Sequence, residues 1–263
     1  MTLQSPPRRH HPGPAASGPV LPGAVLPGPV APDLVERLPH EAVAVLHGAN
    51  VGVLGLGRLG LQIARTLASL GARRLVLDDA GTVRHDDLGA GGYRLADLGR
   101  SRPAAAAGVL ADSATTTAVS PGVLDGHDPG TLTAAVVVTH EQIDPACTWR
   151  LVAQGVPHLL VTWSRGRLEV GPGVIPGLTA CLRCVDLHRA DEGVPPARGR
   201  HAGSGVEDPV LALAGAGLAV ARTFGLLAHG SAPRGLTRTT TLSLPDLAQR
   251  TEHWPVHPVC GCA

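Results

Sequence analysis

Residues 50–60 read NVGVLGLGRLG, and this stretch decides the fold class. Residues 50–54 form a short apolar run typical of a buried strand, and residues 61–70 continue as an amphipathic helix that ends at Gly71. Between them lies a G-x-G-x-x-G turn made by Gly55, Gly57 and Gly60. Glycines at these positions allow a tight turn and bring the backbone close to a phosphate at the helix N-terminus.

The alternation of strands and helices continues along the chain. Residues 74–78 form a second apolar strand, and apolar runs at 134–139 and 157–163 flank a helical stretch at 144–154. This order predicts an α/β fold with a Rossmann-like, doubly wound and mainly parallel sheet. The last third differs, because a small-residue helix near 208–229 precedes alternating strands around 237–244 and 250–254. We therefore expect a C-terminal α+β extension of the same domain.

The N-terminal residues have a different composition from the rest. Residues 1–32 contain nine prolines and four glycines without a period, which predicts a disordered leader. A short helix is expected within residues 33–48, and residues 33–263 are predicted to form one domain. No apolar segment follows Arg8 and Arg9, so the sequence predicts no signal peptide.

The composition excludes several classes of function. Charged residues make up 16% of the 263 residues and the formal net charge is +1, so we expect no nucleic-acid partner. All 22 basic residues are arginine, which excludes mechanisms that need a lysine, such as Schiff-base chemistry. The apolar window 210–228 contains Arg222 and three glycines, and we interpret it as a buried helix rather than a membrane span.

Acidic residues follow the second strand at the distance that a dinucleotide-binding unit requires. Asp78 and Asp79 lie about 20 residues after the glycine turn, where a carboxylate can accept hydrogen bonds from ribose hydroxyl groups. The alternative is that the glycines only permit close packing of helix on strand and bind no nucleotide. The motif does not distinguish NAD from ATP.

Four of the five cysteines form two short-spaced pairs, Cys181-x-x-Cys184 and Cys260-x-Cys262. Four thiolates complete a tetrahedral zinc shell and leave no position for water or substrate, so the pairs predict a structural zinc site within residues 181–263. The alternative is a set of unrelated buried thiols. Cys147 is left over and is expected to lie in the core. Cysteines that are reduced are typical of a cytoplasmic protein, which is the localisation that we expect.

These features together resemble the ThiF/MoeB/HesA family, whose fold is shared with ubiquitin-activating enzymes. The resemblance spans about residues 50–262 and implies that the glycine turn and a ribose-binding acid, best matched by Asp79, hold ATP. In that family the C-terminal carboxylate of a carrier protein is adenylated. The resemblance also implies that Arg102 stands where the family has a phosphate-contacting lysine.

The sequence departs from the family at the reactive positions. Asp87, Ala90 and Gly91 stand where the family has an asparagine, an arginine and a glutamine. Only Glu141 is available where an aspartate normally holds magnesium. These changes remove charge on which phosphoryl chemistry relies, so weakened adenylation is expected.

Residues 177–189 and 254–262 look like one branch of the family, the ThiF-like partners of YcaO cyclodehydratases in the biosynthesis of azoline-containing peptides. This resemblance predicts a scaffold or substrate-presenting protein with a YcaO-type or carrier partner. An active adenylyltransferase, a nicotinamide-dependent oxidoreductase and a pure binding module remain as alternatives. The small residues 215–219 suit a tight helix contact, either within the chain or in a homodimer.

Overall fold

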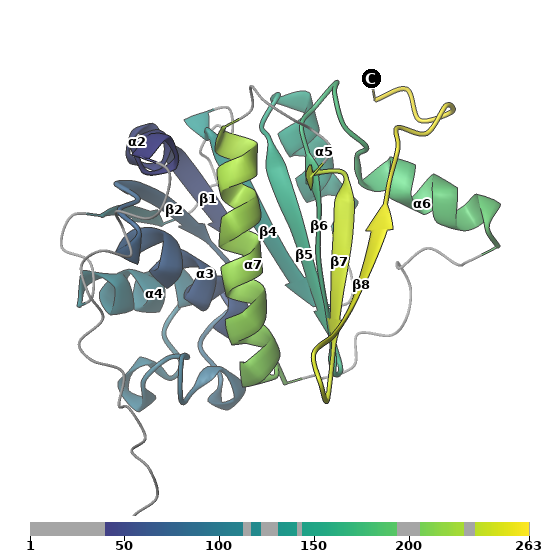
Figure 1. The fold of residues 1–263 in the computed structure, drawn as a ribbon. Coiled ribbons are helices and arrows are strands. Elements are labelled where there is room, and N and C mark those ends of the chain that lie inside the picture. Colours follow the sequence, from purple (N-terminus) through teal and green to yellow (C-terminus); the bar gives the residue numbers. More distant parts are fainter. Residues whose placement is uncertain are drawn as a thin grey trace, which may run out of the picture.

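The computed structural model describes residues 40–112, 117–121, 131–140, 144–193, 206–228 and 235–262. One eight-stranded sheet forms the centre, in the order β3-β2-β1-β4-β5-β6-β7-β8 (Figure 1). The strands are β1 Asn50–Leu54, β2 Arg74–Asp78, β3 Ala118–Pro121, β4 Ala134–His140, β5 His158–Ser164, β6 Arg167–Val174, β7 Arg238–Ser243 and β8 Ala248–His253. The helices are α2 His40–Gly48, α3 Arg58–Ser69, α4 Arg102–Ala111, α5 Pro145–Ala153, α6 Leu182–Asp191 and α7 Pro209–Leu227, with short 3-10 turns η1 His85–Asp87 and η2 Leu95–Asp97.

The sheet has a parallel half and an antiparallel half. Strands β3, β2, β1, β4 and β5 are parallel, whereas β6, β7 and β8 pair antiparallel with their predecessors. This confirms the predicted mixed α/β fold with a mainly parallel sheet. The chain order reverses between β1 and β4, and the glycine turn lies at the carboxyl end of β1. In open α/β sheets ligands bind at such a switch point.

Apolar side chains on both faces of the central strands explain why helices cover both faces. On β4, Val136 packs in the core cluster that contains residues of α3 and α7, whereas its neighbour Val137 packs in the cluster that contains residues of α5 and α6. Successive strand residues point to opposite faces, so a continuous apolar run needs cover on each side. Figure 1 shows α2, α3, α4 and α7 on one face and α5 and α6 on the other.

Helix α7 joins the two halves of the sheet. It is long and apolar enough by composition to cross a membrane, and half of that window is buried inside the protein, where it packs on α3 and on β4, β5 and β6. Gly215 lies against Leu168, whose side chain would overlap an added Cβ. Arg222 donates hydrogen bonds to the carbonyl oxygens of Val170 and Arg238. These contacts are those of a helix packed within a globular domain.

Some elements differ from the sequence expectation. Strand β6 is not among the elements that the sequence analysis predicts. Its register with β5 shifts between Leu159 and Val161, and such an irregularity is a place where a strand tolerates a proline such as Pro172. Within the predicted helix at 33–48, the described part is α2. The predicted leader at 1–32 lies outside the described residues.

Candidate functional site

The three glycines of the turn are required by close contacts. Gly55 has a φ of +96°, and a Cβ on this residue would overlap the carbonyl oxygen of Val138 on β4. A Cβ on Gly60, in the first turn of α3, would overlap the carbonyl oxygen of Gly55. Gly57 is the N-cap of α3 and makes no side-chain cap. The turn therefore presents backbone N–H groups at the start of α3, the arrangement that attracts an anion.

Asp79 lies next to the turn, but backbone groups already occupy its carboxylate. Oδ2 accepts a hydrogen bond from the N–H of Leu56 at 2.6 Å, and Oδ1 accepts one from the N–H of Gly81 at 2.7 Å. A ribose hydroxyl group would have to share these oxygens. In the structure Asp79 holds the glycine turn against the end of β2.

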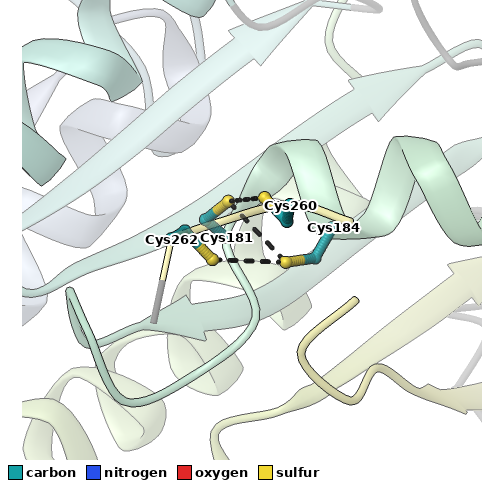
Figure 2. Close-up of side chains that lie close together, drawn as sticks. All are labelled: Cys181, Cys184, Cys260 and Cys262. Carbon is teal, nitrogen blue, oxygen red and sulfur yellow. Dashed lines mark hydrogen bonds between the residues drawn. The ribbon is translucent and has the colours of Figure 1, made fainter. Parts of the chain in front are cut away.

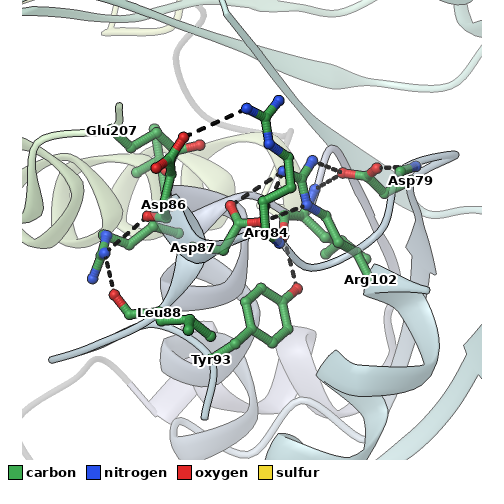
Figure 3. Close-up of polar contacts among 12 residues, drawn as sticks. Asp79, Arg84, Asp86, Asp87, Leu88, Tyr93, Arg102 and Glu207 are labelled. Atoms are coloured by element: carbon green, nitrogen blue, oxygen red, sulfur yellow. Dashed lines mark hydrogen bonds and ion pairs between the residues drawn. The ribbon is translucent and has the colours of Figure 1, made fainter. Parts of the chain in front are cut away.

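Arg102 begins α4 and points into the same site, where it pairs with two carboxylates (Figure 3). Its Nη2 lies 3.1 and 3.0 Å from the two carboxylate oxygens of Asp87, and its Nη1 lies 3.2 Å from Oδ2 of Asp79. All three side chains are largely buried, with at most 21% of each exposed. The guanidinium group predicted to contact a phosphate is therefore already neutralised.

A second arginine of the site was missed by the sequence reasoning. Arg58, between the last two glycines of the turn, is 7% exposed. Its guanidinium group donates to the carbonyl oxygens of Asp86, Leu88 and Ala90 at 3.1, 2.6 and 2.9 Å. This residue fixes the segment after η1 over the glycine turn, and an arginine in a glycine motif is the signal that could have drawn attention to it.

Glu207 was also missed, and it lies at the N-terminus of α3. Its Oε2 accepts a hydrogen bond from the N–H of Leu59, and Oε1 lies where a Cβ of Gly57 would be. Burial raises the pKa of Glu207 to about 7, although the Leu59 N–H and the nearby arginines lower it. Because a helix N-terminus attracts anions, this carboxylate takes the place that the motif offers to a phosphate.

The space around Glu207 is small. A cavity that Leu59 and Trp163 also line has a volume of about 10 Å³, which is room for about one water molecule. Tyr93 packs against the glycine turn, because its buried hydroxyl group donates a hydrogen bond to the carbonyl oxygen of Leu56 at 2.7 Å. Burial raises the pKa of this phenol. The site therefore has tightly packed, internally paired groups.

An aromatic pair lies at the carboxyl ends of the neighbouring strands β4 and β5. The rings of His140 and Trp163 stack with centroids 3.9 Å apart. The residue predicted to replace the magnesium aspartate, Glu141, lies outside the described residues.

The four paired cysteines form a second site, at the start of α6 and in the C-terminal tail (Figure 2). Their sulfur atoms all lie within 4.8 Å of one another. Sulfur–sulfur distances are 3.9 Å for Cys181 and Cys184, 3.5 Å for Cys181 and Cys260, and 3.4 Å for Cys184 and Cys262. A tetrahedral Zn–S₄ site with bonds of about 2.3 Å separates its sulfurs by about 3.8 Å. The four residues therefore fit a zinc ion.

The chemistry of the cluster also favours a cation. All four cysteines are free of disulfides. Burial, together with the neighbouring thiols, raises the pKa values of Cys260 and of Cys262, the latter to about 11. Several thiolates cannot form side by side without a positive ion to compensate them, and a metal supplies that charge.

The C-terminal tail is also held by hydrogen bonds to α6. Nε2 of His257 donates to Asp191 at 2.9 Å, and its Nδ1 accepts from the N–H of Val259. His188 contacts the carbonyl oxygen of Pro255 at 3.0 Å. His188, Asp191 and His257 are close enough for a metal site, but these hydrogen bonds already use both nitrogens of His257. We define His257 and Asp191 as the tail latch.

Cys147 packs against the core on the α5 side. Burial raises its pKa to about 11, and Asp144 and Asp78 add to the rise. A thiol with a raised pKa is a poor nucleophile at neutral pH, in agreement with the predicted structural role.

The sequence and the fold of this chain are similar to those of known proteins. Residues 33–134 match the model of the ThiF family. No curated protein matches the sequence. Among solved structures, Escherichia coli MccB with ATP is 18% identical, with a TM-score of 0.67 over 84% of this chain and 68% of that one.

Two further structures show the same fold. MccB, described as the microcin C7 biosynthetic enzyme, in complex with N-formylated MccA is 17% identical, with a TM-score of 0.66 over 84% of this chain and 69% of that one. PaaA is 18% identical, with a TM-score of 0.62 over 84% of this chain and 78% of that one. The predicted resemblance to the ThiF family is therefore confirmed, and residues 33–134, which include the glycine turn, are the part of the chain that matches it.

Proposed function

We propose that this ThiF-like chain is a scaffold or substrate-presenting partner in the modification of a peptide, with its own adenylation chemistry weakened. The substrate would be the precursor of an azoline-containing peptide or a sulfur-carrier protein. The partner enzyme would be a YcaO-type cyclodehydratase, in line with the resemblance of residues 177–189 and 254–262 to that branch.

One observation carries the proposal: the charges of the predicted nucleotide site are satisfied by the chain itself. Arg102 is paired with Asp79 and Asp87, and Glu207 occupies the N-terminus of α3. A triphosphate would have to displace Glu207 and approach the two aspartates. Phosphoryl transfer depends on positive charge arranged beforehand around the phosphates, and the paired guanidinium group supplies little of it.

A polypeptide substrate is supported by what MccB binds. MccB structures were determined with N-formylated MccA and with selenomethionine-labelled MccA, and a component that carries selenomethionine is a polypeptide. In this chain the switch-point end of the sheet bears the stacked His140 and Trp163. Both residues are half-buried, so part of the pair is exposed for a peptide side chain to pack against.

We further propose a structural zinc ion held by Cys181, Cys184, Cys260 and Cys262, and a cytoplasmic location. The ion would have no catalytic part, because four protein ligands leave no open position. It would tie the tail to α6, and the reduced cysteines agree with a reducing compartment.

Two measurements on the zinc-loaded chain test the proposal. Isothermal titration with Mg·ATP should show an affinity weaker than the millimolar range, with NADH as a control nucleotide. The immobilised chain should retain a YcaO-type cyclodehydratase at micromolar concentrations, with and without a precursor peptide. Failure to retain the enzyme in both conditions would contradict the scaffold function.

An active adenylyltransferase is the second candidate, and the intact glycine turn favours it. Gly55, Gly57 and Gly60 keep the backbone arrangement that suits a phosphate. This function predicts exchange of labelled pyrophosphate into ATP when a carrier protein with a free C-terminal carboxylate is added. Exchange above the background without carrier would replace the scaffold function with the enzymatic one.

A further inference from the structure

The cysteine cluster joins two parts of the chain that lie far apart in the sequence. Cys181 is the N-cap of α6 and Cys184 lies in its first turn, whereas Cys260 and Cys262 belong to the C-terminal tail (Figure 2). All four are free thiols in the structure. Cysteines that lie this close can hold a metal, and they can also form disulfides with one another. The distances between the sulfurs indicate which disulfides form.

The shortest sulfur–sulfur distances run between the helix and the tail. Sγ of Cys184 lies 3.4 Å from Sγ of Cys262, and Sγ of Cys181 lies 3.5 Å from Sγ of Cys260. The two cysteines of α6 are 3.9 Å apart. A disulfide bond is about 2.05 Å long, so each helix–tail pair closes with a movement of about 1.4 Å. The two helix–tail bonds use different sulfurs and can therefore form together.

We infer that the cluster is a site of oxidative modification, in which Cys184 bonds to Cys262 and Cys181 bonds to Cys260 as the metal leaves. In the oxidised chain two covalent bonds, rather than an ion, keep the tail on α6. The inference deepens the proposed zinc site, but the pairing rests only on where the four sulfurs lie.

The reaction begins at Cys262, which is partly exposed, whereas the other three cysteines are at most 9% exposed. The oxidant is a small-molecule disulfide such as oxidised glutathione. The Cys262 thiolate attacks one sulfur of the oxidant, forms a mixed disulfide and releases one thiolate. The Cys184 thiolate then attacks the Cys262 sulfur and releases the second thiolate. Cys181 and Cys260 consume a second molecule of oxidant in the same way, and zinc leaves as Zn²⁺ with its charge unchanged.

The contacts around the cluster keep the sulfurs together while the bonds form. In the tail latch, Nε2 of His257 lies 2.9 Å from Asp191 on α6. The N–H of Cys260 donates to the carbonyl oxygen of His257 at 3.0 Å. The buried Trp254 donates from Nε1 to Oγ1 of Thr239 at 3.0 Å and anchors the start of the tail. None of these contacts uses the ion, so the tail stays beside α6 when the ion leaves.

Peptide mapping tests the pairing, because trypsin cleaves this lysine-free chain only after arginine. Cleavage places Cys181 in the peptide 168–183, Cys184 in the peptide 184–189, and both tail cysteines in the peptide 251–263. The zinc-loaded full chain is treated with oxidised glutathione, alkylated and digested without reduction. The expected product is one species in which all three peptides are linked, and dithiothreitol should separate them.

Other products would overturn the inference. Pairing within the helix would link peptides 168–183 and 184–189 to each other and leave 251–263 alone. A digest in which every cysteine remains alkylated would show that the cluster does not form disulfides. The released metal, measured with a chromogenic chelator, should rise with the linked species to about one zinc per chain. A chain that binds no zinc but gives the three-peptide product would contradict the proposed metal site and support the pairing.

Single variants separate the two bonds. Oxidised Cys260→Ser should link only peptide 184–189 to the tail peptide, and oxidised Cys262→Ser should link only peptide 168–183. Cys147→Ser, outside the cluster, should give the map of the wild type. Exchanged partners in the two tail variants would overturn the assigned pairs.

Thermal unfolding gives a second measurement on the wild-type chain. The helix–tail bonds join residues 79 and 78 positions apart, whereas a bond within the helix pair joins residues 3 positions apart. A disulfide that closes a long segment restricts the unfolded chain more than one that closes a short segment. The oxidised metal-free chain should therefore unfold several degrees above the reduced metal-free chain. Equal unfolding temperatures would contradict the helix–tail bonds.

Discussion

The cysteine cluster and the glycine turn are both places where several polar groups converge, but they converge differently. In the cysteine cluster four groups of the same kind face one another and none can neutralise the others. At the glycine turn, carboxylates and guanidinium groups of opposite charge face one another, and each has a partner from the chain. The first arrangement has room for an external ion, whereas the second already has what a ligand would supply.

The difference shows that a sequence motif suited to a ligand does not by itself mean that the ligand can bind. The backbone of the glycine turn has the form that suits a phosphate, but the side chains around it decide whether the phosphate can enter. Burying a charge is costly unless it is paired, so groups paired within the chain are not free to bind a ligand. The two sites therefore need opposite experiments. In the cysteine cluster a candidate ligand of the metal is removed, and at the glycine turn an internal partner of a charged group is removed.

The largest expected effect comes from Cys184→Ser. Loss of one thiolate should lower the zinc content well below about one ion per chain and lower the free energy of unfolding by several kcal/mol, because the bound metal contributes folding energy. Elemental analysis and thermal unfolding measure the two effects. Cys147→Ser is the matched control, since that thiol lies outside the cluster. Full zinc occupancy in Cys184→Ser would show that the ligand assignment is wrong.

The next effect is the pH dependence of stability caused by Glu207. Its pKa is about 7 in the folded protein against 4.5 for the free side chain, so the folded state binds the proton more tightly. Stability from this group is fully present below about pH 4.5 and is lost as the pH rises through 7, by at most about 3 kcal/mol.

Urea unfolding between pH 5 and 8 measures this dependence. Glu207→Gln should flatten the curve relative to the wild type, because the variant has no carboxyl group to titrate at this position. Parallel curves for the two proteins would exclude Glu207 as the titrating group.

A smaller effect is expected on nucleotide affinity. Asp87→Asn supplies the residue that the family resemblance implies, and Glu207→Gln removes the negative charge at the start of α3. The double variant should bind Mg·ATP about tenfold more tightly than the wild type, because two negative charges beside the phosphates are gone. Isothermal titration measures the affinity, and Asp112→Asn, at an exposed carboxylate, is the control. Equal affinities in wild type and double variant would mean that the internal ion pairs do not exclude the nucleotide.

The smallest effect is expected at the tail latch. Asp191→Asn weakens a single, partly exposed hydrogen bond to His257, so it should lower the free energy of unfolding by about 1 kcal/mol or less. Zinc content should stay unchanged. Loss of the metal in this variant would assign Asp191 a part in the metal site.

The sequence predicted the parts of the fold and of the sites that depend on short spacings between residues. The strand–turn–helix at 50–71 and the cysteine pairs depend on short spacings, and the structure brings each set together. The resemblance assigns Asp79 to the ribose and Arg102 to a phosphate of one nucleotide, and in the structure their side chains lie 3.2 Å apart. A ligand role for these residues stays a prediction.

The remaining features depend on contacts between distant residues. Glu207 reaches Leu59 across 148 positions, and no spacing rule connects a residue before α7 with the start of α3. The three carbonyl partners of Arg58 belong to a loop whose path the sequence does not determine. Strand β6 pairs with β5 through a register shift and with the distant β7 on its other side, and neither pairing can be read from local spacing.

The separation of the cysteine pairs has a kinetic consequence. Between Cys184 and Cys260 lie 75 residues, which include α7, β7 and β8. An ion held by both pairs in the unfolded chain would close this segment into a ring before folding begins. The entropy lost in bringing distant segments together slows folding, so a ring already closed shortens the search that docks α7 and the last two strands. The metal-loaded chain should therefore refold faster than the metal-free chain.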